Sequence, residues 1–196
     1  FDIVVNCTYS NLNQFLPENE QVDYQFELCE KPVISIGKEW QRKSVVIMDG
    51  EFCCIDPLGN DGYYHLLGHV KEAIHERYVV KKYEAPPEYK PYLNNGINKG
   101  FEKSKFNQIL TGTNKFFKYQ SIPVVPQSSK KVNVLNDNVY YLGSMFTVRT
   151  VLPNRDHDDA RPSIITKHSD KLYSIFSGKI GTSVSISNQL VKIINQ

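Results

Sequence analysis

Arg149 is a charged side chain in a setting where a charge needs a partner. It lies in an apolar and aromatic run, with Met145, Phe146 and Leu152, that is typical of a strand. Burying an unpaired guanidinium is costly, so Arg149 predicts a carboxylate or phosphate close by. Its planar fork fits a carboxylate through two parallel hydrogen bonds. The partner belongs either to a substrate or to the protein, for example an aspartate of a nearby loop, and both interpretations stay open.

The segment FSGKIGTS, residues 176–183, is the second candidate for chemistry. A strand that enters a glycine turn and then a helix directs N–H groups and the positive end of the helix dipole to one point, which favours an anion. The segment is not a P-loop, because Tyr173 and Ile180 occupy the positions that require glycine and Ser or Thr. The alternative is an ordinary glycine-rich connection with an exposed Lys179.

Other polar clusters fit metal binding or catalysis less well. His65 and His69 are four residues apart in a segment that is typical of a strand. Four strand residues span about 13 Å, too far for one metal ion, so we expect ordinary strand histidines. The acidic loop 154–160 lacks the spaced ligands and closing glutamate of a calcium loop, and we expect it to be solvated. No Ser-His-Asp or Cys-His order that is typical of an activated nucleophile stands out.

Hydrophobic periodicity predicts the helices that position these residues. The C-terminal helix has the clearest pattern, since Ile186, Leu190, Ile193 and Ile194 share one stripe and residues 181–183 provide N-cap chemistry. A shorter helix is expected around 101–111, with a break near Gly112.

Short apolar or alternating runs predict the strands. Residues 1–7 are consistent with a buried, parallel strand. Further strands are expected at 23–36 with an interruption near Pro32, at 45–48, at 122–135, at 139–152 and at 172–176, with a hairpin over 52–67 that reverses at 59–62. Strands outnumber helices and join mostly through hairpins. The expected fold class is therefore α+β, a largely antiparallel sheet with the C-terminal amphipathic helix and one or two further helices.

Size and composition exclude several classes of protein. The 196 residues are 40% hydrophobic and 22% charged, as in one ordinary globular domain. A net charge of +2 excludes a large basic surface for nucleic acid, and no apolar run is long enough to span a membrane. No basic segment precedes the first apolar run, which argues against a signal peptide. Four cysteines without CxxC spacing indicate buried, reduced thiols and point to the cytoplasm.

The order of these features resembles the C-terminal half of FAD-dependent oxidoreductases of the D-amino-acid oxidase and glycine oxidase superfamily. FDIVVNCTYS resembles the family's VVNATG-like strand near the flavin nucleotide, with Tyr9 where the family usually has glycine. FCCIDPLGNDGYYHLLGH resembles the hairpin of its substrate domain. GSMFTVRTVLPNRDHDDARPSI resembles its G-x-R-P-x-T-P-D-G-x-P segment, with Arg149 on the family's arginine and Thr150 in place of proline. FSGKIGTSVS resembles its closing glycine loop and helix, which contact the isoalloxazine.

The resemblance implies roles for individual residues. Arg149 would bind a substrate carboxylate, and Tyr63, Tyr64 and His65 would line the same site. The implied contacts to the flavin are Thr8, Gly178, Lys179, Ile180, Gly181 and Thr182. The resemblance identifies no catalytic side chain and no metal ligand in this chain.

The family's N-terminal G-x-G-x-x-G fingerprint does not occur among the eleven glycines. Phe1 already enters the first expected strand, so we expect residues 1–196 to be a single domain within a longer FAD oxidoreductase, whose N-terminal dinucleotide-binding portion is missing here. A trimmed terminus is the alternative. The expected activity of the parent is oxidation of an amino acid or related carboxylate by hydride transfer to flavin, and the fragment alone is expected to be inactive. The alternative function is a non-catalytic module that binds a small molecule or a protein.

Overall fold

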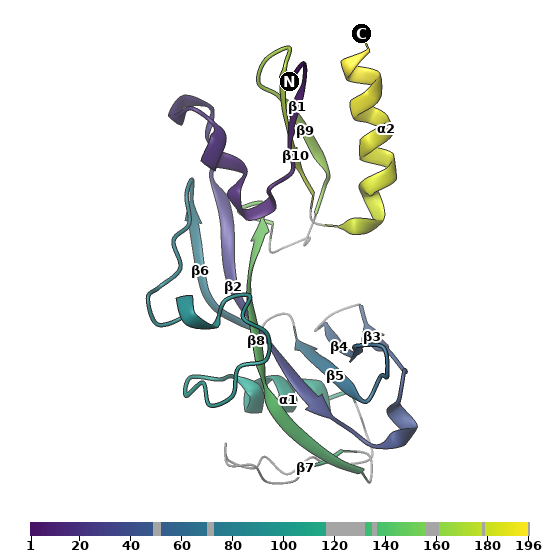
Figure 1. Cartoon of the computed structure of the whole chain (residues 1–196). Coiled ribbons are helices and arrows are strands. Elements are labelled where there is room, and N and C mark those ends of the chain that lie inside the picture. The colour runs from purple at the N-terminus through teal and green to yellow at the C-terminus, as the bar shows by residue number, and fades with distance from the viewer. Residues whose placement is uncertain are drawn as a thin grey trace. The chain divides into compact units, whose positions relative to one another are not determined.

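The computed structural model describes residues 1–48, 52–69, 73–116, 132–134, 137–155, 161–177 and 179–195 (Figure 1). The chain divides into two compact units, whereas a single domain was predicted over residues 1–196. Unit 1 comprises Phe1–Glu27, Arg77–Glu84 and Val148–Gln196, and unit 2 comprises Leu28–Glu76 and Ala85–Thr147. Three long strands run from one unit into the other: β2 (Tyr24–Ser35), β6 (Ile74–Val80) and β8 (Asp137–Val151).

Unit 1 contains a three-stranded sheet in the order β1-β10-β9. β1 (Val4–Asn6) is parallel to β10 (Leu172–Phe176), and β10 is antiparallel to β9 (Ile164–Lys167). The parallel orientation predicted for the first strand is therefore confirmed. Its predicted burial is wrong, because β1 is the edge strand and Val4 is 46% exposed.

The C-terminal helix α2 (Ser183–Ile194) lies beside this sheet in Figure 1. Ile186 and Leu190 are its buried residues, which confirms the predicted helix and the centre of its apolar stripe. A separate cluster packs Leu12 with Tyr24, Phe26 and Phe176, and the rings of Tyr24 and Phe176 stack with centroids 5.2 Å apart.

Unit 2 is built on antiparallel pairs. The seven-stranded sheet has the order β3-β4-β5-β2-β8-β7, with β6 also paired to β2. Its remaining strands are β3 (Val45–Ile47), β4 (Cys53–Leu58), β5 (Tyr64–His69) and β7 (Val132–Val134). The pairs β3–β4, β4–β5, β5–β2 and β7–β8 are antiparallel. The α+β class with a largely antiparallel sheet is therefore confirmed, as is the hairpin formed by β4 and β5.

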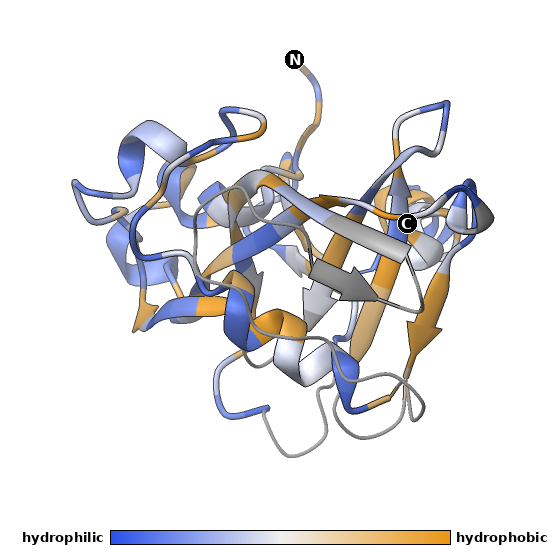
Figure 2. Cartoon of the chain, turned by 90° about the horizontal axis from the view of Figure 1, so that it is seen from below, coloured by the Kyte–Doolittle hydropathy of each residue, from blue (hydrophilic) through white to orange (hydrophobic). Residues whose placement is uncertain are grey.

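Helix α1 (Phe106–Asn114) covers unit 2 with its buried face. Its residues Phe106, Ile109 and Leu110 belong to one core cluster with Trp40 and five other apolar side chains of the sheet and its loops. The helix begins later than expected and continues through Gly112, which is buried. The predicted break is wrong because tertiary packing outweighs the low helix propensity of one glycine. Figure 2 shows that hydrophobic residues, in orange, gather mainly on the strands.

Two further differences concern strands. β2 runs through Pro32 without the predicted interruption. Before Pro32, the N–H of Glu30 donates to the carbonyl of Ala73; after it, Val33, Ile34 and Ser35 pair with β5. The missing proline N–H is tolerated at this change of neighbour. β6 was not predicted at all. Of the expected strand 122–135 only β7 is described, and most of the loop 154–160 also lies outside the described residues.

Short 3-10 helices complete the chain: η1 (Tyr9–Phe15), η2 (Glu18–Glu20), η3 (Lys38–Trp40), η4 (Lys90–Tyr92) and η5 (Ile180–Thr182). Within the ranges given above, no helix has both the length and the apolar character needed to cross a lipid bilayer.

Candidate functional site

The parallel pair β1–β10 brings two of the predicted segments to one edge. Val4, Val5 and Asn6 pair in register with Leu172, Tyr173 and Ser174. Because the strands run in the same direction, the loop after β1 and the turn after β10 both leave from their carboxyl ends. Ligands of open α/β sheets bind outside these ends. Thr8 and residues 179–182 therefore start from the same edge, whereas Gly178 lies outside the described residues.

A cluster of hydroxyl groups organises the turn after β10. Ser163 Oγ lies 2.8 Å from Ser177 Oγ and 2.6 Å from Thr182 Oγ1. Thr182 Oγ1 also donates to the carbonyl oxygen of Lys179 at 2.8 Å. Thr182 is the N-cap residue of α2, but its side chain makes no capping bond. The expected side-chain cap is therefore wrong, because the hydroxyl is used within the turn.

The outer side of this turn is open. Ile180 is 93% exposed, an unusual position for a large apolar side chain. A Cβ added to Gly181 would meet no atom within 4 Å. The turn therefore has space for a planar group that could cover Ile180 and approach the first N–H groups of α2.

Asn6 fixes the loop after β1. The backbone N–H and the hydroxyl of Thr8 donate to Asn6 Oδ1 at 3.2 and 2.7 Å, and Asn6 Nδ2 donates to the carbonyl of Leu12 at 2.8 Å. Tyr9 follows with φ of +54°, the left-handed region that favours glycine. The backbone of this chain thus has a glycine-like conformation at the position where the resemblance has glycine.

Arg149 is held by a buried carboxylate in unit 1. Its Nε donates to Glu27 Oε2 at 2.6 Å, and its Nη2 contacts the same oxygen. Arg77 Nη2 lies 3.1 Å from Glu27 Oε1, and Gln25 Nε2 donates to that oxygen at 2.9 Å. The Glu27 side chain is 1% exposed, and the Arg149 side chain is 23% exposed.

The internal ion pair left open by the sequence is therefore present, with a strand glutamate rather than a loop aspartate as the partner. Sequence reasoning missed Glu27 and Arg77. The available signal was a charged residue within the apolar run of β2.

The other predicted substrate residues belong to unit 2. Tyr63 and Tyr64 are exposed at the β4–β5 hairpin, but His65 is fully buried. His65 Nε2 donates to the carbonyl of Trp40 at 3.0 Å. In this unit His65 is thus a core residue and lines no surface. His65 and His69 lie on strand β5, as expected, and no group of three possible metal ligands occurs in the part of the chain that the structure describes.

Unit 2 contains a buried polar network that the sequence did not reveal. Glu30 is fully buried and accepts hydrogen bonds from His75 Nε2 at 2.7 Å, the N–H of Lys105 at 2.7 Å, Ser104 Oγ at 2.5 Å and Ser144 Oγ. Burial raises the pKa of this carboxyl, but the hydrogen bonds from His75, Ser104, Ser144 and the Lys105 N–H outweigh it, so the pKa lies below its ordinary value.

Aromatic rings enclose the histidine of this network. The His75 ring meets Tyr89, Phe101 and Phe146 edge-on, with centroids 5.6, 5.9 and 5.7 Å away. Glu30 and its donors come from β2, β6, β8 and the start of α1. We interpret the network as structural, because the contacts described for it connect these elements of unit 2 to one another.

A Ser-His-Glu chain of hydrogen bonds occurs in unit 1. His168 Nδ1 lies 2.7 Å from Glu20 Oε2, and His168 Nε2 lies 2.9 Å from Ser174 Oγ. This is the order found around activated serines. Ser174 is buried in the central strand of its sheet, between Asn6 and Thr166 of the neighbouring strands. The arrangement therefore fastens the β9–β10 hairpin to η2.

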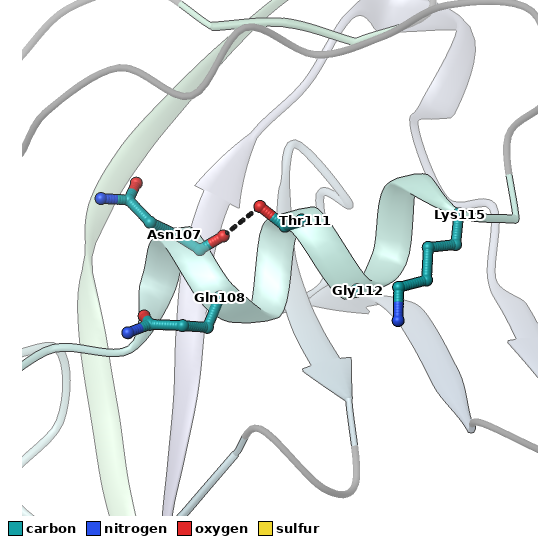
Figure 3. A pocket seen from close by; sticks show the side chains of 5 residues that line it. All are labelled: Asn107, Gln108, Thr111, Gly112 and Lys115. Carbon is teal, nitrogen blue, oxygen red and sulfur yellow. Dashed lines mark hydrogen bonds between the residues drawn. The ribbon is translucent and has the colours of Figure 1, made fainter.

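A hollow of about 470 Å³ lies along α1 (Figure 3). It is lined by Asn107, Gln108, Thr111, Gly112 and Lys115. The hydroxyl of Thr111 donates to the carbonyl of Asn107 at 2.8 Å, as Figure 3 shows. The hollow contains no predicted site residue and no acid–base pair, so it is not the candidate site.

The candidate site is thus the carboxyl edge of the β1–β10 pair together with the Arg149–Glu27–Arg77 cluster of the same unit. No protein-family model matches this sequence, and no curated protein matches it.

Proposed function

We propose that this chain is the substrate-binding and flavin-contacting part of an FAD-dependent oxidoreductase that acts on an amino acid or a related carboxylate. The observation that carries the proposal is the parallel pair β1–β10. It directs the loop of Thr8 and the turn of residues 179–182 from the same carboxyl edge. These are the two segments whose sequences resemble flavin-contacting segments of the D-amino-acid oxidase superfamily.

The exposed edge of β1 supports the proposal that an FAD-binding portion is a partner of this chain. Ile3, Val4 and Val5 are each at least 38% exposed, although adjacent strand residues face opposite sides of a sheet. Parallel sheets normally have both faces covered. A further strand beside β1, with its connecting helices, would cover these side chains.

The residues around the turn fit a flavin ring. Ile180 would pack against the ring, and Lys179 with the positive end of α2 would stabilise negative charge on its pyrimidine end. Bound FAD would supply the hydride acceptor. The chain itself would bind the ring, keep it in place and exclude water from its face.

Arg149 would orient the substrate. Its guanidinium is held in position by Glu27, and its partial exposure allows a carboxylate to reach it from solvent. Fixing that carboxylate directs the Cα–H of the substrate toward the acceptor, which lowers the entropic part of the barrier.

Spectroscopy and kinetics of the full-length parent test this proposal. The purified parent is expected to be yellow, with flavin absorbance that persists through gel filtration. Replacing Arg149 with Leu should raise KM for the carboxylate substrate about tenfold or more, because a hydrogen-bonded charge pair is lost, with the flavin retained. A KM equal to that of the wild type would contradict the carboxylate role.

A non-catalytic binding module is the second candidate. The pairing of Arg149 with Glu27 favours it, because the arginine already has a protein carboxylate. Two exposed tyrosines, Tyr63 and Tyr64, could then contact a protein or small molecule. A colourless parent that takes up no added FAD would support the module over the oxidoreductase.

A further inference from the structure

The loop between η4 and α1 contains a dipeptide that can react with itself. Asn95 is followed by Gly96, and this is the only Asn-Gly pair in the sequence. In such a pair the backbone nitrogen of the glycine attacks the side-chain amide carbon of the asparagine and closes a succinimide ring. Glycine favours the attack because it has no Cβ to hinder the approach and adopts a wide range of backbone angles.

The structure leaves this pair open to the reaction. Asn95 and Gly96 are both exposed. Gly96 has φ of +64°, and a Cβ added to it would meet no atom within 4 Å. The Gly96 N–H donates no hydrogen bond to the part of the chain that the structure describes. The attacking nitrogen therefore has no described hydrogen bond to give up before it reacts.

Hydrogen bonds to β8 fix the loop on both sides of the pair. The N–H of Asn94 donates to the carbonyl of Phe146 at 3.0 Å, and the backbones of Asn98 and Ser144 exchange two hydrogen bonds of 2.9 Å. Asn98 Nδ2 also donates to the carbonyl of Gly96 at 3.1 Å. The reactive pair thus lies in a short exposed connection between two fixed points. An atom added to the main chain there would strain these bonds.

The side chain of Asn95 takes part in the same loop through its amide group. Asn95 Nδ2 donates to the carbonyl of Pro91 at 3.0 Å. A carboxylate in place of this amide has no proton to donate and only accepts. Two acceptor oxygens would then face each other, so loss of the amide removes this hydrogen bond as well.

We propose that Asn95 is a site of spontaneous deamidation that limits the lifetime of the folded unit 2. The Gly96 nitrogen gives its proton to water and bonds to Cγ of Asn95, and the bond from Cγ to Nδ2 breaks as ammonia leaves. Water then opens the succinimide at one of its two carbonyls, which yields aspartate or isoaspartate. One water is consumed and one ammonia is released, with no oxidant or reductant. Isoaspartate has one more atom in the main chain between the two fixed points.

The effect of this change should reach the buried part of unit 2. Ser144, which pairs with Asn98, also donates its hydroxyl to Glu30. Leu93, beside the loop, packs against the aromatic cluster that contains Phe146. We therefore expect the isoaspartate form to unfold at a lower urea concentration than the fresh chain.

Incubation of the 196-residue chain in heavy-oxygen water at neutral pH, followed by digestion in ordinary water, tests the reaction. Only residues that deamidate during the incubation take up heavy oxygen, and fragment masses of the peptides locate them. We expect Asn95 to react about tenfold faster than Asn94, because the residue after Asn95 has no Cβ. An isoaspartate-specific methyltransferase with a labelled methyl donor should then label the incubated chain.

Variants assign the label to one residue. Asn95→Gln keeps an amide donor but closes the ring far more slowly, so the methyltransferase label should disappear. Asn60→Gln is the matched control, since Asn60 is exposed in another glycine-containing turn, and its label should equal that of the wild type. Equal labelling of Asn95→Gln and the wild type, or uptake of heavy oxygen at other asparagines before Asn95, would overturn the site.

Urea denaturation tests the effect on unit 2. Trp40 lies in the core of this unit, so its fluorescence follows unfolding there. The chain carrying isoaspartate should have a lower midpoint than the fresh chain, whereas Asn95→Gln incubated for the same time should keep its own midpoint. An unchanged midpoint of the isoaspartate form would refute the limit on the lifetime of unit 2.

Discussion

Replacing Glu30 with Gln should strongly destabilise unit 2. The carboxylate accepts four hydrogen bonds in a fully buried position, from two hydroxyls, one backbone N–H and His75. A glutamine keeps one acceptor oxygen and turns an NH₂ group toward the remaining donors. Hydrogen bonds to charged groups contribute about 1.5–3 kcal/mol each, and breaking a buried charge pair costs about 3–5 kcal/mol. We therefore expect the free energy of unfolding to fall by about 4 kcal/mol.

The single tryptophan makes this measurable. Trp40 is buried in the core of unit 2, so its fluorescence during urea denaturation reports on that unit. Glu88→Gln is the control, because Glu88 pairs with Lys103 at 3.4 Å on the surface, where ion pairs contribute little. If both variants lose the same small amount of stability, the reasoning about the buried network is refuted.

The same variant should change the acid sensitivity of unit 2. The pKa of Glu30 lies below the value of 4.5 that is ordinary for glutamate, because its hydrogen bonds outweigh the effect of burial. The native state therefore binds fewer protons than the unfolded state in this range. The stability from the carboxylate is fully present above pH 4.5 and is lost as the pH falls through the pKa of the folded state. The difference between wild type and Glu30→Gln should shrink below pH 4.5, and a constant difference would contradict this.

Two other predictions concern a glycine and the cysteines. Gly143→Ala should lower the free energy of unfolding by more than about 1 kcal/mol. Gly143 has φ of +135°, and an added Cβ would lie 2.4 Å from the carbonyl oxygen of Asn98. Urea denaturation measures the effect, and an unchanged midpoint would argue against the close approach. Maleimide at mildly alkaline pH should label Cys7 well before Cys54, because Cys7 is exposed while burial raises the pKa of the Cys54 thiol to about 11. Mass spectrometry of the peptides gives the order, and faster labelling of Cys54 would show that it is not protected as described.

Several local patterns were read correctly because neighbouring residues decide them. The β4–β5 hairpin follows from the two glycines at the reversal, Gly59 and Gly62, which both have positive φ. The C-terminal helix follows from the spacing of Ile186 and Leu190. The predicted burial of three cysteines also agrees with the structure, since Cys29 and Cys53 are buried and Cys54 is partly buried, whereas Cys7 is exposed. Cys7 follows β1, the edge strand of its sheet, so its predicted burial is wrong.

Contacts between distant residues could not be read in this way. The partner of Arg149 is 122 residues away, and the Tyr9 phenol that binds the Thr150 N–H is 141 residues away. Neither contact produces a periodic pattern in the sequence. Glu30 gathers its donors across separations of up to 114 residues, which explains why an apparently ordinary strand glutamate was overlooked.

The sequence by itself determined the fold class and the types and order of most elements, though not β6, because alternation, helical spacing and turn residues act over a few positions. It also determined that Arg149 needs a partner, because an arginine in an apolar strand requires one on general grounds. Only the tertiary structure decided that this partner is Glu27, that β1 is an exposed edge parallel to β10, and that Tyr9 reaches the arginine strand. Those facts depend on which strands become neighbours, and pairing between strands far apart in the chain is a property of the folded molecule.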